Sequence, residues 1–204
     1  MTSNLYIINV DRIDLYTIFC DMDNTLVYTN YANYIAYKRA VKDVLGGNFV
    51  FNSKLRLTRE VIKKLFPNID YKQYNAIIKL KEKYYSDCLF LTKLNLNLVN
   101  LLKKFKKTSR IVLVSSSRKI RVHQILDYYK LENLFSHIIT QDDIPKGKFF
   151  NKYEYALYVI GVDSSRVIIY EDDLNQVKSA LNFGIPLKNI VNINIGGDYE
   201  KVYY

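Results

Sequence analysis

Cysteine is scarce in this chain, and long apolar runs are absent from it. The two cysteines, Cys20 and Cys88, are too few for a disulfide framework and fit no metal-binding motif. Cys20 lies inside an apolar run, where we expect a small core residue. No apolar run is long enough to span a membrane, and Met1-Thr2-Ser3-Asn4 lacks the pattern of a secretory signal. We therefore expect a cytoplasmic protein without a membrane anchor.

Internal repeats and low-complexity linkers are also absent. The 204 residues suffice for one or two domains with a full core, and the apolar fraction of 49% is ordinary for a globular protein. The net charge of +10 is high, but the lysines are scattered or fall on predicted helix faces, which are usually solvated. We expect this basic surface to attract small phosphorylated anions, and we do not expect a nucleic-acid partner.

Five short apolar runs are typical of strands, and helical patterns separate the last four. The runs are Leu15–Cys20, Ile111–Ser115, His137–Thr140, Val167–Tyr170 and Ile190–Ile193. The helical patterns cover residues 94–107, 118–129, 153–160 and 175–183. This alternation indicates βαβ units, so we predict an α/β fold with a doubly wound parallel sheet. Leu5–Val10 is a further candidate for an edge strand or hairpin.

A stretch of roughly seventy residues between the first two predicted strands is too long for a crossover loop. Asn30–Leu45, Thr58–Leu65 and Tyr71–Tyr85 have helical periodicity within it. We therefore predict a core domain of residues 1–28 and 96–204 and an inserted helical cap domain of residues 29–95. A cap over the carboxyl edge of the sheet would exclude water and select the substrate.

The first predicted strand ends in Asp21-Met22-Asp23-Asn24-Thr25. A buried strand that stops at two acids delivers them to the sheet edge where α/β proteins place their chemistry. One carboxylate can attack while the other exchanges a proton, and their joint charge favours a divalent cation. Asp, Asn and Thr are also common turn residues, so this segment alone leaves an ordinary turn open.

Three later segments strengthen the first. Ser115-Ser116-Ser117-Arg118 ends the second strand with hydroxyls and backbone N–H groups that can hold a phosphoryl oxygen. Lys148 follows in a loop, where a lysine could neutralise the nucleophile and the transferring group. Glu171-Asp172-Asp173 ends the fourth strand, where its carboxylates could complete the oxygen shell of Mg²⁺. Each segment is weak evidence by itself, but together they indicate a metal-and-phosphate site.

These four motifs, in this order, resemble the haloacid dehalogenase superfamily of phosphoryl-transfer enzymes. The likeness extends from Leu15 to about Ile195 and is greatest to the subgroup of β-phosphoglucomutase and related sugar phosphatases, which carries a helical cap. The resemblance implies a Rossmann-like core and a reaction through an aspartyl-phosphate. It implies that Asp21 is the nucleophile and Asp23 the general acid and base.

The resemblance also implies ligands for the phosphoryl group and the cation. The phosphoryl ligands would be Ser115, Ser116, Lys148 and Thr25. The ligands of Mg²⁺ would be Asp21, the backbone carbonyl of Asp23, Asp172 and Glu171. An anionic carboxylate attacks an anionic phosphate efficiently only if a cation and a lysine offset the repulsion.

The predicted cap departs from the mutase pattern. Asn33 stands where the mutases place a histidine, and the glycine of their Gly-x-Ser-Arg turn is replaced in Arg56-Leu57-Thr58-Arg59. Arg59 and Arg118 are candidates for binding a distal acidic group of the substrate. These departures favour hydrolysis over mutase activity.

We therefore predict a Mg²⁺-dependent phosphomonoester hydrolase of a small phosphorylated metabolite, such as a sugar phosphate. We expect a monomer or a weak homo-oligomer. The alternatives are a β-phosphoglucomutase-like phosphomutase, a polynucleotide end phosphatase and a catalytically idle binding module. Four charged groups kept together speak against the idle module.

Overall fold

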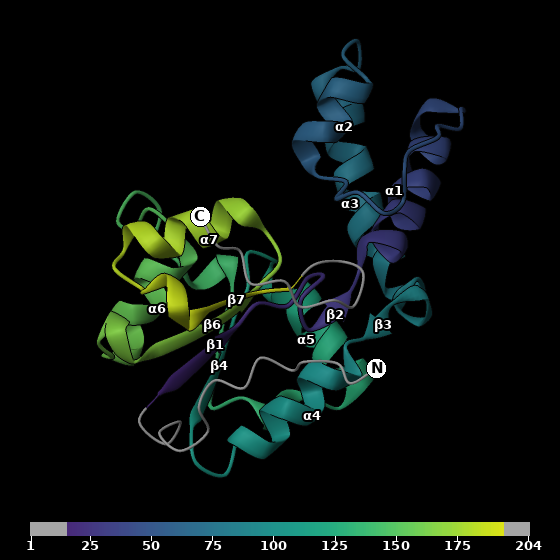
Figure 1. Cartoon of the computed structure of the whole chain (residues 1–204). Coiled ribbons are helices and arrows are strands. Elements are labelled where there is room, and N and C mark those ends of the chain that lie inside the picture. The colour runs from purple at the N-terminus through teal and green to yellow at the C-terminus, as the bar shows by residue number, and fades with distance from the viewer. Residues whose placement is uncertain (1–15, 194–204) are drawn as a thin grey trace. The chain divides into compact units, whose positions relative to one another are not determined.

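The computed structural model describes residues 16–193, which divide into two compact units (Figure 1). The described residues on either side of Val27–Lys93 form the first unit, and Val27–Lys93 forms the second. The candidate strand Leu5–Val10 lies outside the described residues. None of the helices in residues 16–193 is long and apolar enough to cross a membrane.

The first unit contains a five-stranded sheet in the order β5-β4-β1-β6-β7. Its strands are β1 (Thr17–Cys20), β4 (Arg110–Val114), β5 (His137–Ile139), β6 (Val167–Glu171) and β7 (Ile190–Asn192). Every neighbouring pair is parallel, and β1 lies between β4 and β6 with Cys20 opposite both Leu113 and Tyr170. The predicted parallel α/β sheet is therefore confirmed.

Four helices cover the sheet, with α6 and α7 on one face and α4 and α5 on the other (Figure 1). They are α4 (Leu96–Phe105), α5 (Lys119–Tyr129), α6 (Lys152–Ile160) and α7 (Leu174–Asn182). Short 3-10 turns lie at Leu89–Leu91, Glu132–Leu134, Gln141–Asp143, Ser164–Arg166 and Leu187–Asn189. Side-chain caps explain where two of the helices begin, because Asn95 accepts from the backbone of Leu98 and Asn151 from that of Glu154.

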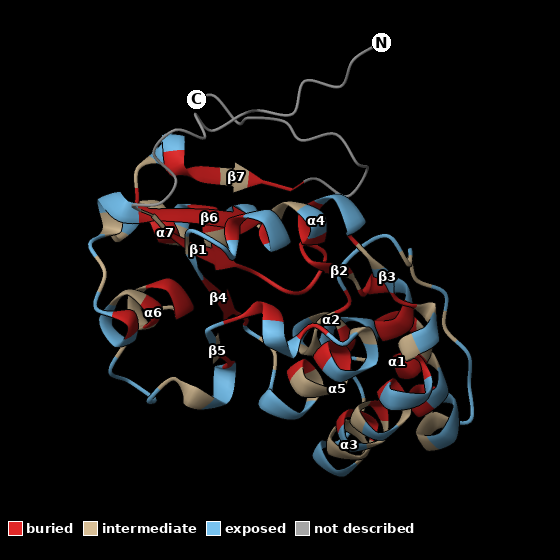
Figure 2. Ribbon diagram, turned by 90° about the horizontal axis from the view of Figure 1, so that it is seen from below, coloured by how far each residue is buried: buried red, intermediate tan, exposed pale blue. Residues whose placement is uncertain are grey.

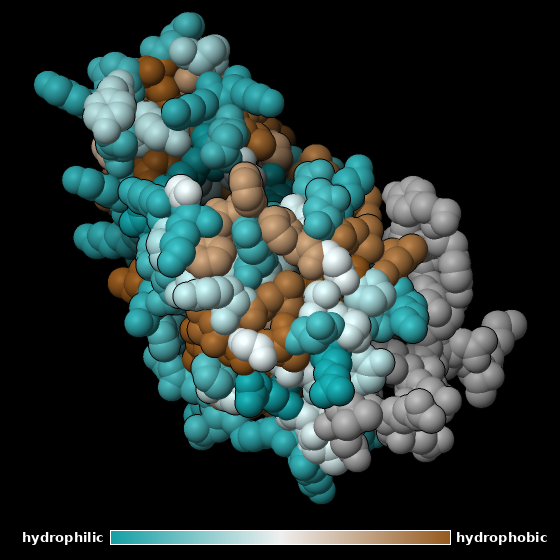
Figure 3. All heavy atoms as spheres, turned by 90° about the vertical axis from the view of Figure 1, so that its left-hand side faces the viewer, coloured by the Kyte–Doolittle hydropathy of each residue, from teal (hydrophilic) through white to brown (hydrophobic). Residues whose placement is uncertain are grey.

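The central strands β1, β4 and β6 are buried almost throughout (Figure 2), as near-continuous apolar runs require. Phe19, Val112 and Ile169 belong to one core cluster with Ala156 of α6 and Ala180 of α7. Figure 3 shows the side that is on the left in Figure 1, with hydrophobic side chains at the surface among hydrophilic ones. The core cluster thus holds the central strands between helices, and the polar residues lie at the strand ends.

The second unit is helical, with α1 (Asn30–Leu45), α2 (Arg59–Leu65) and α3 (Tyr71–Asp87). Two short strands, β2 (Val27–Tyr28) and β3 (Lys93–Leu94), pair where the chain enters and leaves it. Its core contains Tyr37, Ile62 and Ile77, one from each helix. A capping box between Asp70 and Gln73 fixes the start of α3. Side-chain caps thus mark the starts of α2 and α3, where Thr58 accepts from the backbone of Val61 and Asp70 from that of Gln73.

Candidate active site

Three adjacent strands end at one edge of the sheet and carry the polar residues of the site. Asp21 follows β1, Ser115 follows β4, and Glu171 ends β6. Backbone hydrogen bonds between the strands continue into the site. The backbone N–H of Asp21 donates to the carbonyl of Tyr170, and that of Ser115 donates to the carbonyl of Ile139. In parallel sheets, ligands bind beyond the carboxyl ends of strands where the winding direction changes. The fold thus brings together residues that lie far apart in the sequence.

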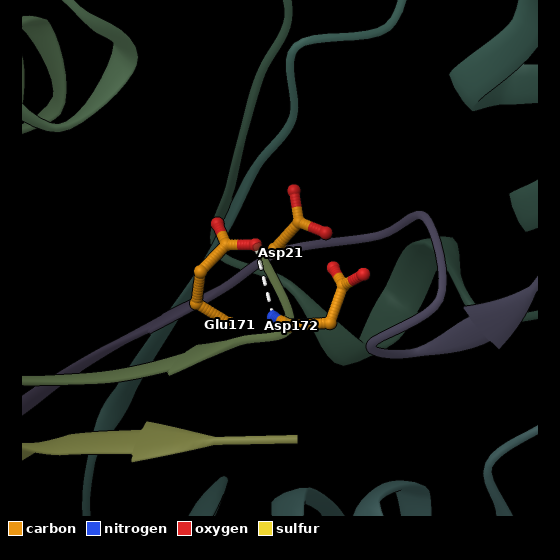
Figure 4. Close-up of side chains that lie close together, drawn as sticks. All are labelled: Asp21, Glu171 and Asp172. Atoms are coloured by element: carbon orange, nitrogen blue, oxygen red, sulfur yellow. Dashed lines mark hydrogen bonds between the residues drawn. The ribbon is translucent and has the colours of Figure 1, made fainter. Parts of the chain in front are cut away.

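Three carboxylates converge at this edge (Figure 4). One oxygen each from Asp21, Glu171 and Asp172 lie within 4.8 Å of one another. Asp21 and Glu171 are only 3% and 1% exposed. Asp21 Oδ2 is buried and has no hydrogen-bond partner within the described residues. Because hard divalent cations bind oxygen ligands, an unsatisfied buried oxygen beside two further carboxylates fits a cation such as Mg²⁺.

The lysine at this cluster is Lys152. Its Nζ lies 2.5 Å from Asp21 Oδ1 and 2.8 Å from Glu171 Oε2, and its side chain is 2% exposed. Lys152 is the first residue of α6, directly after the cap residue Asn151. The start of α6 therefore determines where the ammonium group of Lys152 lies.

Lys148, expected at the site, lies elsewhere. It is exposed, and its Nζ lies 5.6 Å from the ring centroid of Phe149 and 5.5 Å from that of Tyr158. Lys148 belongs to the loop before α6, where Gly147 has a φ of 73°. The sequence pattern predicted a lysine from this loop at the acids, whereas the lysine that contacts Asp21 and Glu171 is Lys152, at the start of α6.

Burial and charge act against each other at these groups. Burial, reinforced by the charge of Glu171, raises the pKa of Asp21 to about 7, although Lys152 opposes the shift. Burial alone would lower the pKa of Lys152, but the charges of Asp21 and Glu171 raise it above its ordinary value. Lys152 is therefore a fixed cation, and a divalent cation beside Asp21 would favour the ionised carboxylate.

Glu171 accepts from four donors. Lys152 and the Tyr153 hydroxyl donate to Oε2, the hydroxyl at 2.6 Å, while the backbone N–H groups of Asp172 and Asp173 donate to Oε1 at 3.0 and 2.9 Å. The ring of Tyr153 is fully buried and stacks on Phe19, with centroids 6.5 Å apart. Glu171 is thus held rigidly and in turn holds Lys152.

Replacing Tyr153 by phenylalanine should lower the free energy of unfolding by about 2 kcal/mol, because hydrogen bonds to charged groups contribute roughly that amount. Urea unfolding at an unchanged m-value would measure the loss. Tyr155→Phe on the same helix is the matched control, since the Tyr155 hydroxyl makes no hydrogen bond to the described residues. Equal losses in both variants would show that the hydroxyl of Tyr153 does not hold Glu171.

The second carboxylate of the first motif points to other partners. Ser117 Oγ donates to Asp23 Oδ2 at 2.6 Å, and Arg121 Nη2 donates to Asp23 Oδ1 at 2.5 Å. Asn24 follows with a φ of 62°, a left-handed conformation that asparagine tolerates better than most residues. The carboxylates of Asp21 and Asp23 therefore contact different donors.

The remaining residues expected at the phosphoryl site lie near this edge. Thr25 is fully buried, and its Oγ1 donates to Asp172 Oδ1 at 3.1 Å. Ser115 is fully buried, and its Oγ accepts from the backbone N–H of Ser117 at 3.0 Å. Ser116 is exposed. Thr25 therefore orients an acidic residue, while Ser115 orders the backbone after β4.

Two of the three residues expected to contact the substrate make bonds inside the helical unit. Asn33 Nδ2 donates to the carbonyl of Leu57 at 2.7 Å, and Arg59 pairs with Glu82 at 2.8 Å. Arg118 is exposed at the start of α5. Their roles toward a substrate stay predictions.

Sequence reasoning missed Lys152, Tyr153, Ser117 and Arg121 as parts of the site. Asn151 was the available signal for Lys152 and Tyr153, because a cap residue before the third helical pattern predicts a helix that starts at Lys152, after the loop. Ser117 was within the quoted motif but had no role. Arg121 carried no local signal, since an arginine in a first helical turn is usually solvated.

The comparisons with known proteins agree with this architecture. The sequence profile of the haloacid dehalogenase-like hydrolase family matches residues 18–190. No curated protein matches the chain. Among solved structures, a predicted phosphoglycolate phosphatase from Haemophilus somnus 129pt is 16% identical with a TM-score of 0.71, over 93% of this chain and 89% of that chain.

Two further solved structures are similar. A subfamily IA hydrolase of the same superfamily from Geobacter sulfurreducens PCA is 15% identical with a TM-score of 0.66, over 88% of this chain and 87% of that chain. A predicted β-phosphoglucomutase from Thermotoga maritima is 21% identical with a TM-score of 0.64, over 87% and 84%. At these identities, the likenesses show the fold alone.

Proposed function

This chain belongs to the haloacid dehalogenase-like hydrolase family, and on that premise we propose that it is a Mg²⁺-dependent phosphatase of a small phosphorylated metabolite. The observation that carries the proposal is the state of Asp21. One of its oxygens contacts Lys152, and the other is buried without a hydrogen-bond partner among residues 16–193. Such a carboxylate is oriented, partly neutralised and able to attack.

In the proposed reaction, Asp21 attacks the phosphorus atom of the bound phosphomonoester. The new bond joins a carboxylate oxygen to phosphorus, the bond from phosphorus to the leaving oxygen breaks, and Asp23 gives that oxygen a proton. A water molecule then gives a proton back to Asp23 and attacks the aspartyl-phosphate, which releases phosphate and regenerates Asp21. The two carboxylates need separate surroundings for these roles, and their different donors support that division.

Lys152 replaces Lys148 as the proposed phosphoryl-binding lysine, with Ser115 and Ser116 beside it. Asp21, the backbone carbonyl of Asp23 and Asp172 would hold Mg²⁺, and its charge would offset the repulsion between nucleophile and phosphate. Glu171 lies next to these groups, but its four donors favour a role in orienting Lys152. We extend the proposal to the helical unit Val27–Lys93 as the cap that selects the substrate.

With Mg²⁺ present, the protein should hydrolyse p-nitrophenyl phosphate, and removal of divalent cations with EDTA should lower the rate to background. Restoring Mg²⁺ should restore the rate, because EDTA removes the ion without altering the protein. Release of p-nitrophenol reports the rate. Undiminished hydrolysis in EDTA after dialysis would contradict the cation requirement.

A panel of sugar phosphates, nucleotides and phosphorylated carboxylic acids would identify the substrate class. Free phosphate and isomerised product are measured for each compound. Free phosphate from at least one compound supports a hydrolase. Isomerised product without free phosphate would indicate a phosphomutase, and no turnover of any compound would indicate an idle binding module.

A further inference from the structure

Two side chains, Ser117 and Arg121, donate to the carboxylate of Asp23, and the proposed reaction assigns no role to either of them. Asp23 is 4% exposed, and its two oxygens accept from Ser117 Oγ at 2.6 Å and Arg121 Nη2 at 2.5 Å. The Arg121 side chain is 19% exposed, so this ion pair is largely shielded from water. A shielded pair of this kind is sensitive to geometry, since breaking it leaves a buried charge without compensation.

The backbone positions of both donors are fixed independently of Asp23. The backbone N–H of Ser117 donates to Ser115 Oγ at 3.0 Å, and its carbonyl accepts from the backbone of Gln141 at 3.0 Å. Arg121 lies in the first turn of α5, whose cap residue is Arg118. Because the donors are anchored to the strand ends and to a helix, the direction of the Asp23 carboxylate follows from them.

The two acids of the motif are oriented from opposite faces of the sheet. Lys152 reaches Asp21 from the first turn of α6, and Arg121 reaches Asp23 from the first turn of α5. Figure 1 shows these helices on opposite faces of the sheet. Each carboxylate therefore has its own cation on its own helix, so that the direction of one acid can be altered separately from that of the other.

We propose that Arg121, supported by Ser117, is a positioning residue that aims Asp23 at the leaving-group oxygen before the substrate binds. The inference rests on the proposed function, in which Asp23 donates the proton. A protonated carboxyl group has one O–H donor and keeps acceptor capacity on its oxygens, so Asp23 can give its proton to the leaving-group oxygen while Ser117 and Arg121 still donate to it. Misplacement of a catalytic group by about 1 Å can lower a rate by on the order of 10²-fold.

The test compares two substrates with different leaving groups. p-Nitrophenolate departs without a proton, whereas the alkoxide of glycerol phosphate requires one. The measured quantity is the ratio of kcat/KM for glycerol phosphate to that for p-nitrophenyl phosphate. Arg121→Met should lower this ratio by about tenfold, because only the alkyl substrate depends on the direction of Asp23. Arg121→Lys should lower the ratio less than Arg121→Met does, because it keeps a positive charge at this position.

Two matched variants sharpen the measurement. Arg110→Met removes an exposed arginine at the opposite end of β4 and should leave the ratio unchanged. Ser117→Ala removes the second donor and should lower the ratio in the same direction as Arg121→Met. It also keeps the proposal testable if Arg121→Met does not fold, which thermal unfolding would reveal.

The double variant Asp23→Asn/Arg121→Met separates positioning from a structural role. Its ratio should equal that of Asp23→Asn within about threefold, since residues that act through one group are not additive. If Arg121→Met lowers both substrates equally, or if the effects add in the double variant, Arg121 only stabilises the fold and the inference is overturned. An unchanged ratio in Asp23→Asn itself would instead remove the acid role assigned under the proposed function.

Discussion

Asp21→Asn should abolish turnover, with a fall in kcat on the order of 10⁴-fold or more. An amide keeps the size of the side chain but has neither the negative charge nor the nucleophilicity needed to form the aspartyl-phosphate. The substitution also removes the negative charge of the ion pair between Asp21 Oδ1 and Lys152 Nζ, which lie 2.5 Å apart. Steady-state release of phosphate measures the loss, and phosphoenzyme trapped by acid quench should be absent.

The same variant has an expected effect on stability that depends on pH. Burial raises the pKa of Asp21 to about 7 from 3.8. A carboxyl group with a raised pKa destabilises the folded protein once pH exceeds its unfolded value, and this loss grows until pH passes the folded value. In EDTA, Asp21→Asn should therefore gain more in melting temperature relative to the parent at pH 8 than at pH 4.

The two readouts separate a wrong nucleophile from a damaged fold. A stable Asp21→Asn protein that retains measurable turnover would show that another group attacks phosphorus. An inactive variant whose melting temperature drops at both pH values would show that the amide disrupts the site. Only inactivity with a folded protein supports Asp21 as the nucleophile.

Lys152→Met should lower kcat/KM by on the order of 10³-fold, whereas Lys148→Met should change it by less than about threefold. The two lysines lie four positions apart in the sequence, yet one is buried against Asp21 and Glu171 and the other is exposed beside aromatic rings. Identical changes at both positions control for the loss of a lysine as such. Initial rates with p-nitrophenyl phosphate measure both.

Lys152→Met should also lower the free energy of unfolding in EDTA by about 3 kcal/mol, because it leaves two neighbouring buried carboxylates without their cation. Mg²⁺ should recover part of this loss if it binds between Asp21 and Asp172. A large rate loss in Lys148→Met with a small one in Lys152→Met would overturn the assignment of the lysine.

The fold could be predicted because its pattern is local and repeated. Each strand is a short apolar run, and the helices between them have clear periodicity, so the parallel sheet followed from neighbouring residues. Asp21 and Glu171-Asp172 could be placed at one sheet edge for the same reason, since each follows a buried strand. Side chains at the carboxyl ends of adjacent parallel strands must meet.

The rest of the site depends on contacts that no local pattern encodes. Lys152 reaches the acids because it is the first residue of α6, directly after the cap residue Asn151, and the exact start of a helix is not encoded by its periodicity. Arg121 pairs with a residue 98 positions away. Sequence patterns locate the ends of helices only to within a residue or two, and here the start of α6 is the residue that contacts the acids.

Because Lys152 lies on α6, the loop before this helix does not have to hold the lysine near the acids. In an arrangement with the lysine in the loop, every insertion or deletion there would displace the cation from the acids. Here Asn151 and the first turn of α6 hold Lys152, and the exposed segment that includes Lys148 and Phe150 precedes them. If Lys152 is the phosphoryl-binding lysine, as proposed, a change in the length of that segment need not displace the lysine from the acids.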